Sequence, residues 1–210
     1  FYRMPKTSVL ESWNEQVGES FRFSIKASRR ITHFKRLKEA GDETAYLLEA
    51  TQTLGDRLGV VLFQLPPNLR LDLPRLEAFL ELLPKGTRAA FEFRHESWFD
   101  ETVFDSLRSR NFALVGVDAD DEALEEITST ADWGYLRLRR ADYERADLAS
   151  WAARVRAQNW ERAFVFFKHE DDGAGPRMAG EFLEVAERAA ERKPAARGGR
   201  KSKSEEREAG

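Results

Sequence analysis

The stretch Val60-Val61-Leu62-Phe63-Gln64-Leu65-Pro66-Pro67 decides the class of fold that this chain adopts. A continuous apolar run with no regular polar alternation is typical of a strand that is buried on both faces. Two consecutive prolines cannot continue the strand, because proline lacks the backbone N–H group that pairs with a neighbour. Strands buried on both faces occur mainly in parallel sheets covered by helices. The stretch therefore predicts an α/β protein.

The sequence on both sides of this strand alternates between strand and helix patterns. Further strands are predicted at residues 21–26, 88–93, 112–117, 135–138 and 164–168. Helices are predicted at residues 9–17, 43–54, 73–83, 101–110, 148–157 and 177–192. Regular alternation of strands and helices predicts repeated βαβ units and one parallel sheet.

This arrangement predicts an incomplete TIM-like (β/α) barrel. A complete barrel of this type has eight strands, and we expect about six of them here, with the first two missing. Such a barrel would leave an exposed sheet edge and be only marginally stable. We expect the barrel domain to cover residues 1–191. Residues 192–210, which are rich in Lys, Arg and Glu, are expected to form a disordered tail.

Composition limits the classes of function. The 210 residues are 41% hydrophobic and 34% charged, with a formal net charge of −3 and no cysteine. The lack of a long apolar run or a leader predicts a cytoplasmic protein with no membrane partner. The lack of cysteine excludes disulfides, thiolate catalysis and cysteine-ligated metals. No dinucleotide, P-loop or nucleophile-elbow motif is present, so we expect no cofactor. The oligomeric state stays open.

Each of the six predicted strands ends in one polar side chain. Because side chains alternate across a strand, the position of each residue indicates the face on which it lies. The six residues, which we expect on the inner face, are Lys26, Gln64, Glu92, Asp118, Arg137 and Lys168, and Arg94 continues the face of Glu92. Active sites of β/α barrels lie at this end of the strands. We therefore expect a functional pocket, with a purely structural network of ion pairs as the alternative.

The charges of this ring favour an anionic ligand. Four cations and two carboxylates give the ring a formal charge of +2, and unpaired buried charge is costly unless a ligand offsets it. A small phosphorylated or carboxylated metabolite would fit, handled by acid/base chemistry. The candidate catalytic residues are Glu92, Asp118 and Lys26. The candidate substrate-binding residues are Gln64, Arg94, Arg137, Lys168, Trp98, Tyr2 and His33.

Three further alternatives remain open. The basic loop at residues 29–36 could bind phosphate groups, including those of nucleic acid. The net negative charge of the whole chain, however, is poor evidence for a protein that binds nucleic acid. Histidines 33, 95 and 169, together with nearby carboxylates, could hold a divalent metal for a hydrolase or isomerase. None of these histidines has the HxH or HExxH spacing of common metal sites. Trp98 could stack on a ligand ring, or it could pack with Phe99 to hold the helix that follows.

Several segments resemble, in order and spacing, the domain-of-unknown-function family 72, the YecE-like proteins. The segments are Phe1–Pro5, Phe23–Ala27, Ile31–His33, Leu62–Pro67, Glu92–Trp98 and Phe166–His169. The resemblance implies a TIM-like barrel of the bacterial or archaeal cytosol, with no established activity. It also implies two strands before Phe1, or roughly 30–50 further residues. The family's YxRxHG pattern lacks its His and Gly at Tyr135–Arg140, and its paired asparagines are replaced by Lys168 and His169.

Overall fold

The computed structural model describes residues 4–168 and 173–191. Within them, a parallel sheet has the strand order β1-β2-β3-β4-β5-β6. The strands are β1 (Phe23–Lys26), β2 (Leu58–Gln64), β3 (Ala89–Glu92), β4 (Ala113–Asp118), β5 (Trp133–Leu138) and β6 (Arg162–Phe167). The helices are α1 (Thr7–Glu15), α2 (Gly41–Gln52), α3 (Leu73–Leu80), α4 (Glu101–Arg108), α5 (Arg145–Arg156) and α6 (Ala174–Glu191). Short helical turns are η1 (Arg30–Phe34), η2 (Gly55–Arg57) and η3 (Glu96–Trp98).

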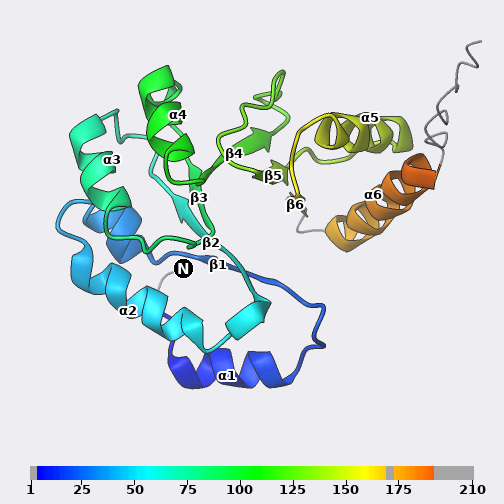
Figure 1. Cartoon of the computed structure of the whole chain (residues 1–210). Helices are drawn as coiled ribbons and strands as arrows, with labels where there is room; N and C mark the ends of the chain where they lie inside the picture. Colours follow the sequence, from blue (N-terminus) through cyan, green and yellow to red (C-terminus); the bar gives the residue numbers. More distant parts are fainter. Residues whose placement is uncertain (1–3, 169–172, 192–210) are drawn as a thin grey trace, which may run out of the picture.

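The sheet curls into a half-barrel with helices around it (Figure 1). All neighbouring strands are parallel, and β1 and β6 lie at the two edges of the sheet. The predicted class, an incomplete TIM-like barrel, is therefore confirmed. The proposed tail at residues 192–210 lies outside the described residues. Among the helices that are described, none is both long enough and apolar enough to cross a lipid bilayer.

The position of β2 in the fold explains why its sequence is continuously apolar. Val61 and Phe63 belong to the large core that includes helical residues such as Leu76 of α3. Their neighbours Val60 and Leu62 belong to a separate cluster on the inner face of the half-barrel. Both faces of β2 are thus removed from water, and burial of apolar surface contributes roughly 25 cal/mol per Å² to stability. This two-sided burial also defines an inner face for every strand.

Two of the helices, α3 and α4, begin where the sequence supplies a side-chain cap. Asp72 accepts a hydrogen bond from the Arg75 backbone N–H at the start of α3, where Pro74 occupies the first turn. Asp100 accepts one from the Thr102 backbone N–H at the start of α4. Each cap satisfies a backbone donor that has no partner within the helix. These starts fix the loops that leave β2 and β3.

Trp98 lies in the core and not at the surface of the rim, which contradicts the expectation that it binds substrate. Its side chain is 0% exposed and belongs to the large core. The indole ring stacks on Phe93 with ring centroids 4.6 Å apart, and its N–H donates to the Leu69 carbonyl oxygen at 2.6 Å. Trp98 thereby holds the loop after β2 against the loop after β3. Phe99, in contrast, is 53% exposed.

We expect Trp98→Ala to lower the free energy of unfolding by about 3–5 kcal/mol, because it leaves a large cavity in the core. Trp98→Phe keeps most of the volume but leaves the Leu69 carbonyl without its donor, at a cost of about 1–3 kcal/mol. Urea unfolding followed by circular dichroism measures both changes. Phe99→Ala is the matched control and should change stability by no more than about 0.5 kcal/mol. Equal effects of Trp98→Ala and Phe99→Ala would contradict this account.

Candidate functional site

Four of the predicted rim residues form one hydrogen-bonded chain on the inner face. The Lys26 ammonium donates to Gln64 Oε1 at 2.7 Å, and Gln64 Nε2 donates to Glu92 Oε1 at 2.6 Å. Arg137 Nη1 donates to the other carboxylate oxygen, Glu92 Oε2, also at 2.6 Å. The amide of Gln64 must point its oxygen toward the cation and its nitrogen toward the carboxylate, since the reverse orientation would lose both bonds. The hydrogen-bond donors therefore point toward Glu92 from both sides, from Lys26 through Gln64 and from Arg137.

The register of the sheet brings these side chains together. Gln64 lies directly opposite Glu92 in the β2–β3 pairing. Arg137 lies opposite Val117 of β4 and Phe166 of β6. The strand β4 offers no polar side chain to the inner face at this level, so Arg137 reaches across it to Glu92. Glu92 is only 1% exposed, and a buried carboxylate of this kind needs donors from its neighbours.

Asp118 is not part of this chain, and its predicted position on the inner face is wrong. Val115 and Val117 occupy the inner face of β4, so Asp118 points to the outer side. There Asp118 Oδ2 accepts a hydrogen bond from the Tyr143 hydroxyl at 2.7 Å and pairs with Arg140 Nε at 2.8 Å. Burial, and the hydrogen bond to Asp118, raise the pKa of Tyr143. Asp118 thus ties together the segments that follow β4 and β5.

The remaining rim cations create a positive field around Lys26. Burial lowers the pKa of Lys26, and so does the charge of Arg137, while Glu92 raises it. The charges of Arg94 and Lys168 lower the pKa of Lys26 further. Three cations against one carboxylate leave the amine in a positive environment, which favours its neutral form.

Tyr2, which was also predicted to bind the ligand, lies outside the described residues.

Burial and nearby positive charges also lower the pKa of His33. Its Nδ1 lies 2.9 Å from the Thr32 hydroxyl oxygen. Burial lowers the pKa of His33, and the charges of Arg29, Lys26 and Arg94 lower it further. The imidazole therefore stays neutral to lower pH than usual, and it can donate or accept a hydrogen bond at the rim.

A cavity of about 340 Å³ opens beside Glu92, at the ends of β3 and β4. Arg94 and Arg139 both line it, together with apolar side chains that include Val117 and Phe99. The lining also contains carboxylate residues, namely Glu92, Glu96, Asp121 and Glu122. Arg139 was not predicted. Its Nε is buried and makes no hydrogen bond to any described residue. The signal was present in the sequence, because Arg139 follows Arg137 by two positions and so continues the inner face of β5.

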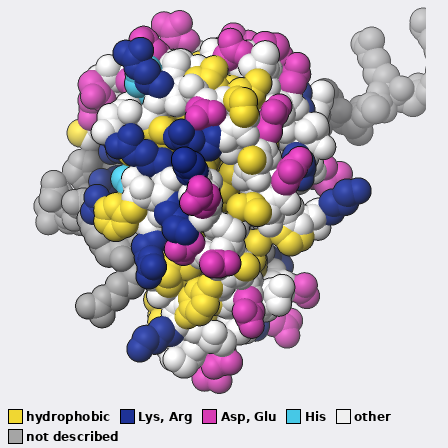
Figure 2. Space-filling model, turned by 90° about the vertical axis from the view of Figure 1, so that its left-hand side faces the viewer, with side chains coloured by type: hydrophobic (Ala, Val, Ile, Leu, Met, Phe, Trp, Pro, Cys, Tyr) yellow, Lys and Arg dark blue, Asp and Glu magenta, His cyan; other side chains and the backbone are white. Residues whose placement is uncertain are grey.

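The basic loop at residues 29–36 is partly neutralised by α2. Lys35 Nζ lies 2.8 Å from Glu43 Oε2, and Arg30 Nη2 lies 3.8 Å from Glu43 Oε1. In Figure 2, Lys and Arg side chains gather near the middle of one face of the molecule, with Asp and Glu side chains spread around them. In residues 4–168 and 173–191, no three His, Asp or Glu side chains come close enough together to hold a metal ion.

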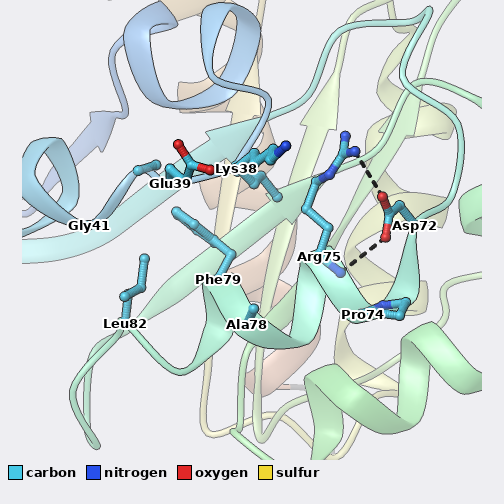
Figure 3. Close-up of a pocket in the computed structure, with 11 residues that line it drawn as sticks. Lys38, Glu39, Gly41, Asp72, Pro74, Arg75, Ala78, Phe79 and Leu82 are labelled. Atoms are coloured by element: carbon cyan, nitrogen blue, oxygen red, sulfur yellow. Dashed lines mark hydrogen bonds and ion pairs between the residues drawn. The ribbon is translucent and has the colours of Figure 1, made fainter.

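A larger cavity, of about 560 Å³, lies between residues 37–41 and α3, and none of the rim residues lines it (Figure 3). Its one arginine, Arg75, is already paired with Asp72 at 2.8 Å. Phe79 and Leu82 form much of its wall. This cavity has the size of a ligand site, but its charged groups do not converge on one point as they do at the rim.

Comparison with known proteins gives a family and a fold. The chain matches the family "Protein of unknown function DUF72" over residues 1–202. It is 30% identical over 118 residues to the UPF0759 protein YecE of Escherichia coli strain K12, and equally to that of strain O157:H7. The match covers 56% of this chain and 43% of each YecE protein, so the chain spans less than half the length of these relatives.

Solved structures of DUF72 family proteins share the fold. One from Enterococcus faecalis V583 superposes with a TM-score of 0.75 at 19% identity, covering 89% of this chain and 86% of that protein. One from Thermotoga maritima MSB8 superposes with a TM-score of 0.74 at 22% identity, covering 89% and 82%. The half-barrel is therefore shared with solved proteins of the family.

We expect the pKa of Lys26 to lie below the ordinary value of a lysine side chain when the dimethylated residue is followed by ¹³C NMR. Arg94→Gln should raise the pKa of Lys26, because it removes a neighbouring positive charge. Glu92→Gln should lower the pKa of Lys26, because it removes the one carboxylate that favours the ammonium form. Arg75→Gln, which removes a charge far from the rim, should leave it unchanged. A pKa of Lys26 at or above the ordinary lysine value would contradict the positive field described above.

Proposed function

Because this chain belongs to the family described as protein of unknown function DUF72, we propose a function from the site itself: an enzyme that binds a small phosphorylated or carboxylated metabolite at the rim of the half-barrel and transfers a proton through Lys26. The observation that carries the proposal is the hydrogen-bonded chain that joins Lys26 to Arg137, set beside a cavity that Arg94 and Arg139 line. The C-terminal ends of barrel strands are also where this fold builds its active sites.

Arg94, Arg137 and Arg139 are the proposed anion-binding groups. Arg137 gives one N–H group to Glu92, and a guanidinium has five N–H donors in a planar fork. Its other donors suit a carboxylate or phosphate oxygen, and Arg139 adds a buried Nε that lacks a protein acceptor among the described residues. A cavity of about 340 Å³ lies near the lower end of the usual size range for small-molecule sites. These features support a compact anionic ligand.

Lys26 is the proposed proton carrier. Its lowered pKa shifts the amine toward the neutral form, which is the form that can accept a proton from a substrate. Gln64 orients the amine through the 2.7 Å hydrogen bond. Both carboxylate oxygens of Glu92 already accept hydrogen bonds from Gln64 and Arg137. This supports a positioning role for Glu92, while Asp118 takes no part because it points to the outer side of the sheet.

A thermal-shift screen with phosphate, phosphosugars and small di- and tricarboxylates tests the proposal. A ligand at about 100 times its dissociation constant should stabilise the folded state by roughly 2.7 kcal/mol, which raises the melting temperature by several degrees. Arg139→Gln should abolish the shift without lowering the melting temperature of the free protein, because Arg139 Nε has no hydrogen-bond partner to lose. Lys26→Gln should keep much of the binding but lose turnover of the ligand so identified, by about 10²-fold or more.

Arg75→Gln is the matched control for Arg139→Gln, because it also removes one guanidinium but lies outside the rim. It should leave the ligand-induced shift unchanged. If no small anion stabilised the protein, or if both variants lost the shift equally, the rim would be a structural ion network and the proposal would fail.

A further inference from the structure

A second charged cavity lies at the opposite end of the strands, where β2 and β3 begin. Its volume is about 540 Å³. Its walls come from the end of α2, from η2, from the first residues of β2 and from the turn before β3. Three arginines line it: Arg22 before β1, Arg88 before β3 and Arg162 at the start of β6. They come from distant parts of the sequence and converge on this one cavity.

These arginines have no carboxylate partners within the described part of the chain. Arg22 donates to the carbonyl oxygens of Glu19 and Phe21, and Arg88 donates to the carbonyl oxygen of Gly59 at 3.0 Å. None of the three is within 4.0 Å of a carboxylate oxygen of a described residue. One carboxylate residue, Asp56, also lines the cavity. Three arginines against one carboxylate residue leave the lining of the cavity with an excess of positive charge.

The three charges act on one another. Burial lowers the pKa of Arg88, and the charge of Arg162 lowers it further; Asp132 opposes this effect, and Arg22 adds to it. An arginine still remains charged near neutral pH, because its ordinary pKa is so high. Repulsion among like charges in a confined space favours binding of an anion that lies between them.

We propose that this cavity is a second ligand site, distinct from the rim, which binds the phosphate group of a small molecule. A phosphate group carries about two negative charges at neutral pH and offers three strong acceptor oxygens, which suits three guanidinium groups better than a single carboxylate would. Guanidinium forks bind phosphate oxygens in pairs. The volume of the cavity is larger than one phosphate requires, so an attached organic group also fits. This proposal does not depend on the function proposed for the rim.

Calorimetric titration of the full chain with inorganic phosphate and pyrophosphate tests the site. Arg162→Gln is the most informative variant, because Arg162 is exposed and its side chain makes no hydrogen bond to a described residue that the fold would lose. We expect it to weaken pyrophosphate binding by about tenfold or more, the effect of losing one charge-assisted contact. Arg22→Gln should act in the same direction.

Lys85→Gln is the matched control. Lys85 is exposed and lies beside Pro84 and Gly86, two residues of the cavity wall, but it does not line the cavity itself. It should change the affinity by less than about twofold. Equal weakening by Lys85→Gln and Arg162→Gln would show a response to net charge only and would overturn the proposal.

A comparison with Arg139→Gln separates this site from the rim. If pyrophosphate binding survived Arg162→Gln and was lost in Arg139→Gln, the anion would bind only at the rim, and the second site would be refuted. If it survived Arg139→Gln and was lost in Arg162→Gln, the second site would be supported whatever the rim binds. The absence of any binding up to about 10 mM, a dissociation constant too weak for a specific site, would also overturn the proposal.

Discussion

The buried carboxylate of Glu92 is the group around which the inner face of this half-barrel is organised. A carboxylate with 1% exposure is tolerated only if charged or polar donors surround it. Gln64 from the strand on one side and Arg137 from beyond the strand on the other side meet that requirement. Since Gln64 then needs a donor for its own oxygen, Lys26 of β1 is held as well. One buried charge thereby fixes the relative positions of side chains from four strands, and it leaves the cations around it close together.

The fold and most of this site could be predicted from the sequence, for a simple reason. The apolar run of β2 and the regular alternation of strands and helices reflect burial on both faces, which is a property of local sequence. The two-residue period of a strand then assigned Gln64, Glu92 and Arg137 to one face, and parallel strands bring their ends to the same edge. The helix and strand positions followed from these patterns to within a few residues. The identity of the hydrogen-bonded partners did not, because it depends on the register of neighbouring strands.

Predictions from the sequence alone failed at three residues of the site and its surroundings, namely Asp118, Trp98 and Arg139. Alternation tells which residues of one strand share a face, but it does not tell which face is inside, and β4 presents Val115 and Val117 to the inside. The sequence around Trp98 contains charged neighbours, so it suggested a rim position, although the indole ring is needed to close the core over Phe93 and Leu69. Arg139 lies one residue beyond the last strand residue, Leu138, so a prediction limited to the strand itself stopped at Arg137.

The net charge of the whole chain differs in sign from the local charge around the residues proposed to bind ligands. The whole sequence has a formal charge of −3, which argues against an anionic partner if it is read as an average. Yet the pKa values of Lys26 and His33 at one end of the strands, and of Arg88 at the other, are lowered in part by neighbouring cations. Because the field at a short distance depends on the nearest charges and is screened beyond about 10 Å, acidic residues elsewhere do not cancel it. The middle of the sheet is apolar and separates the two ends, so each end must be judged by its own charges.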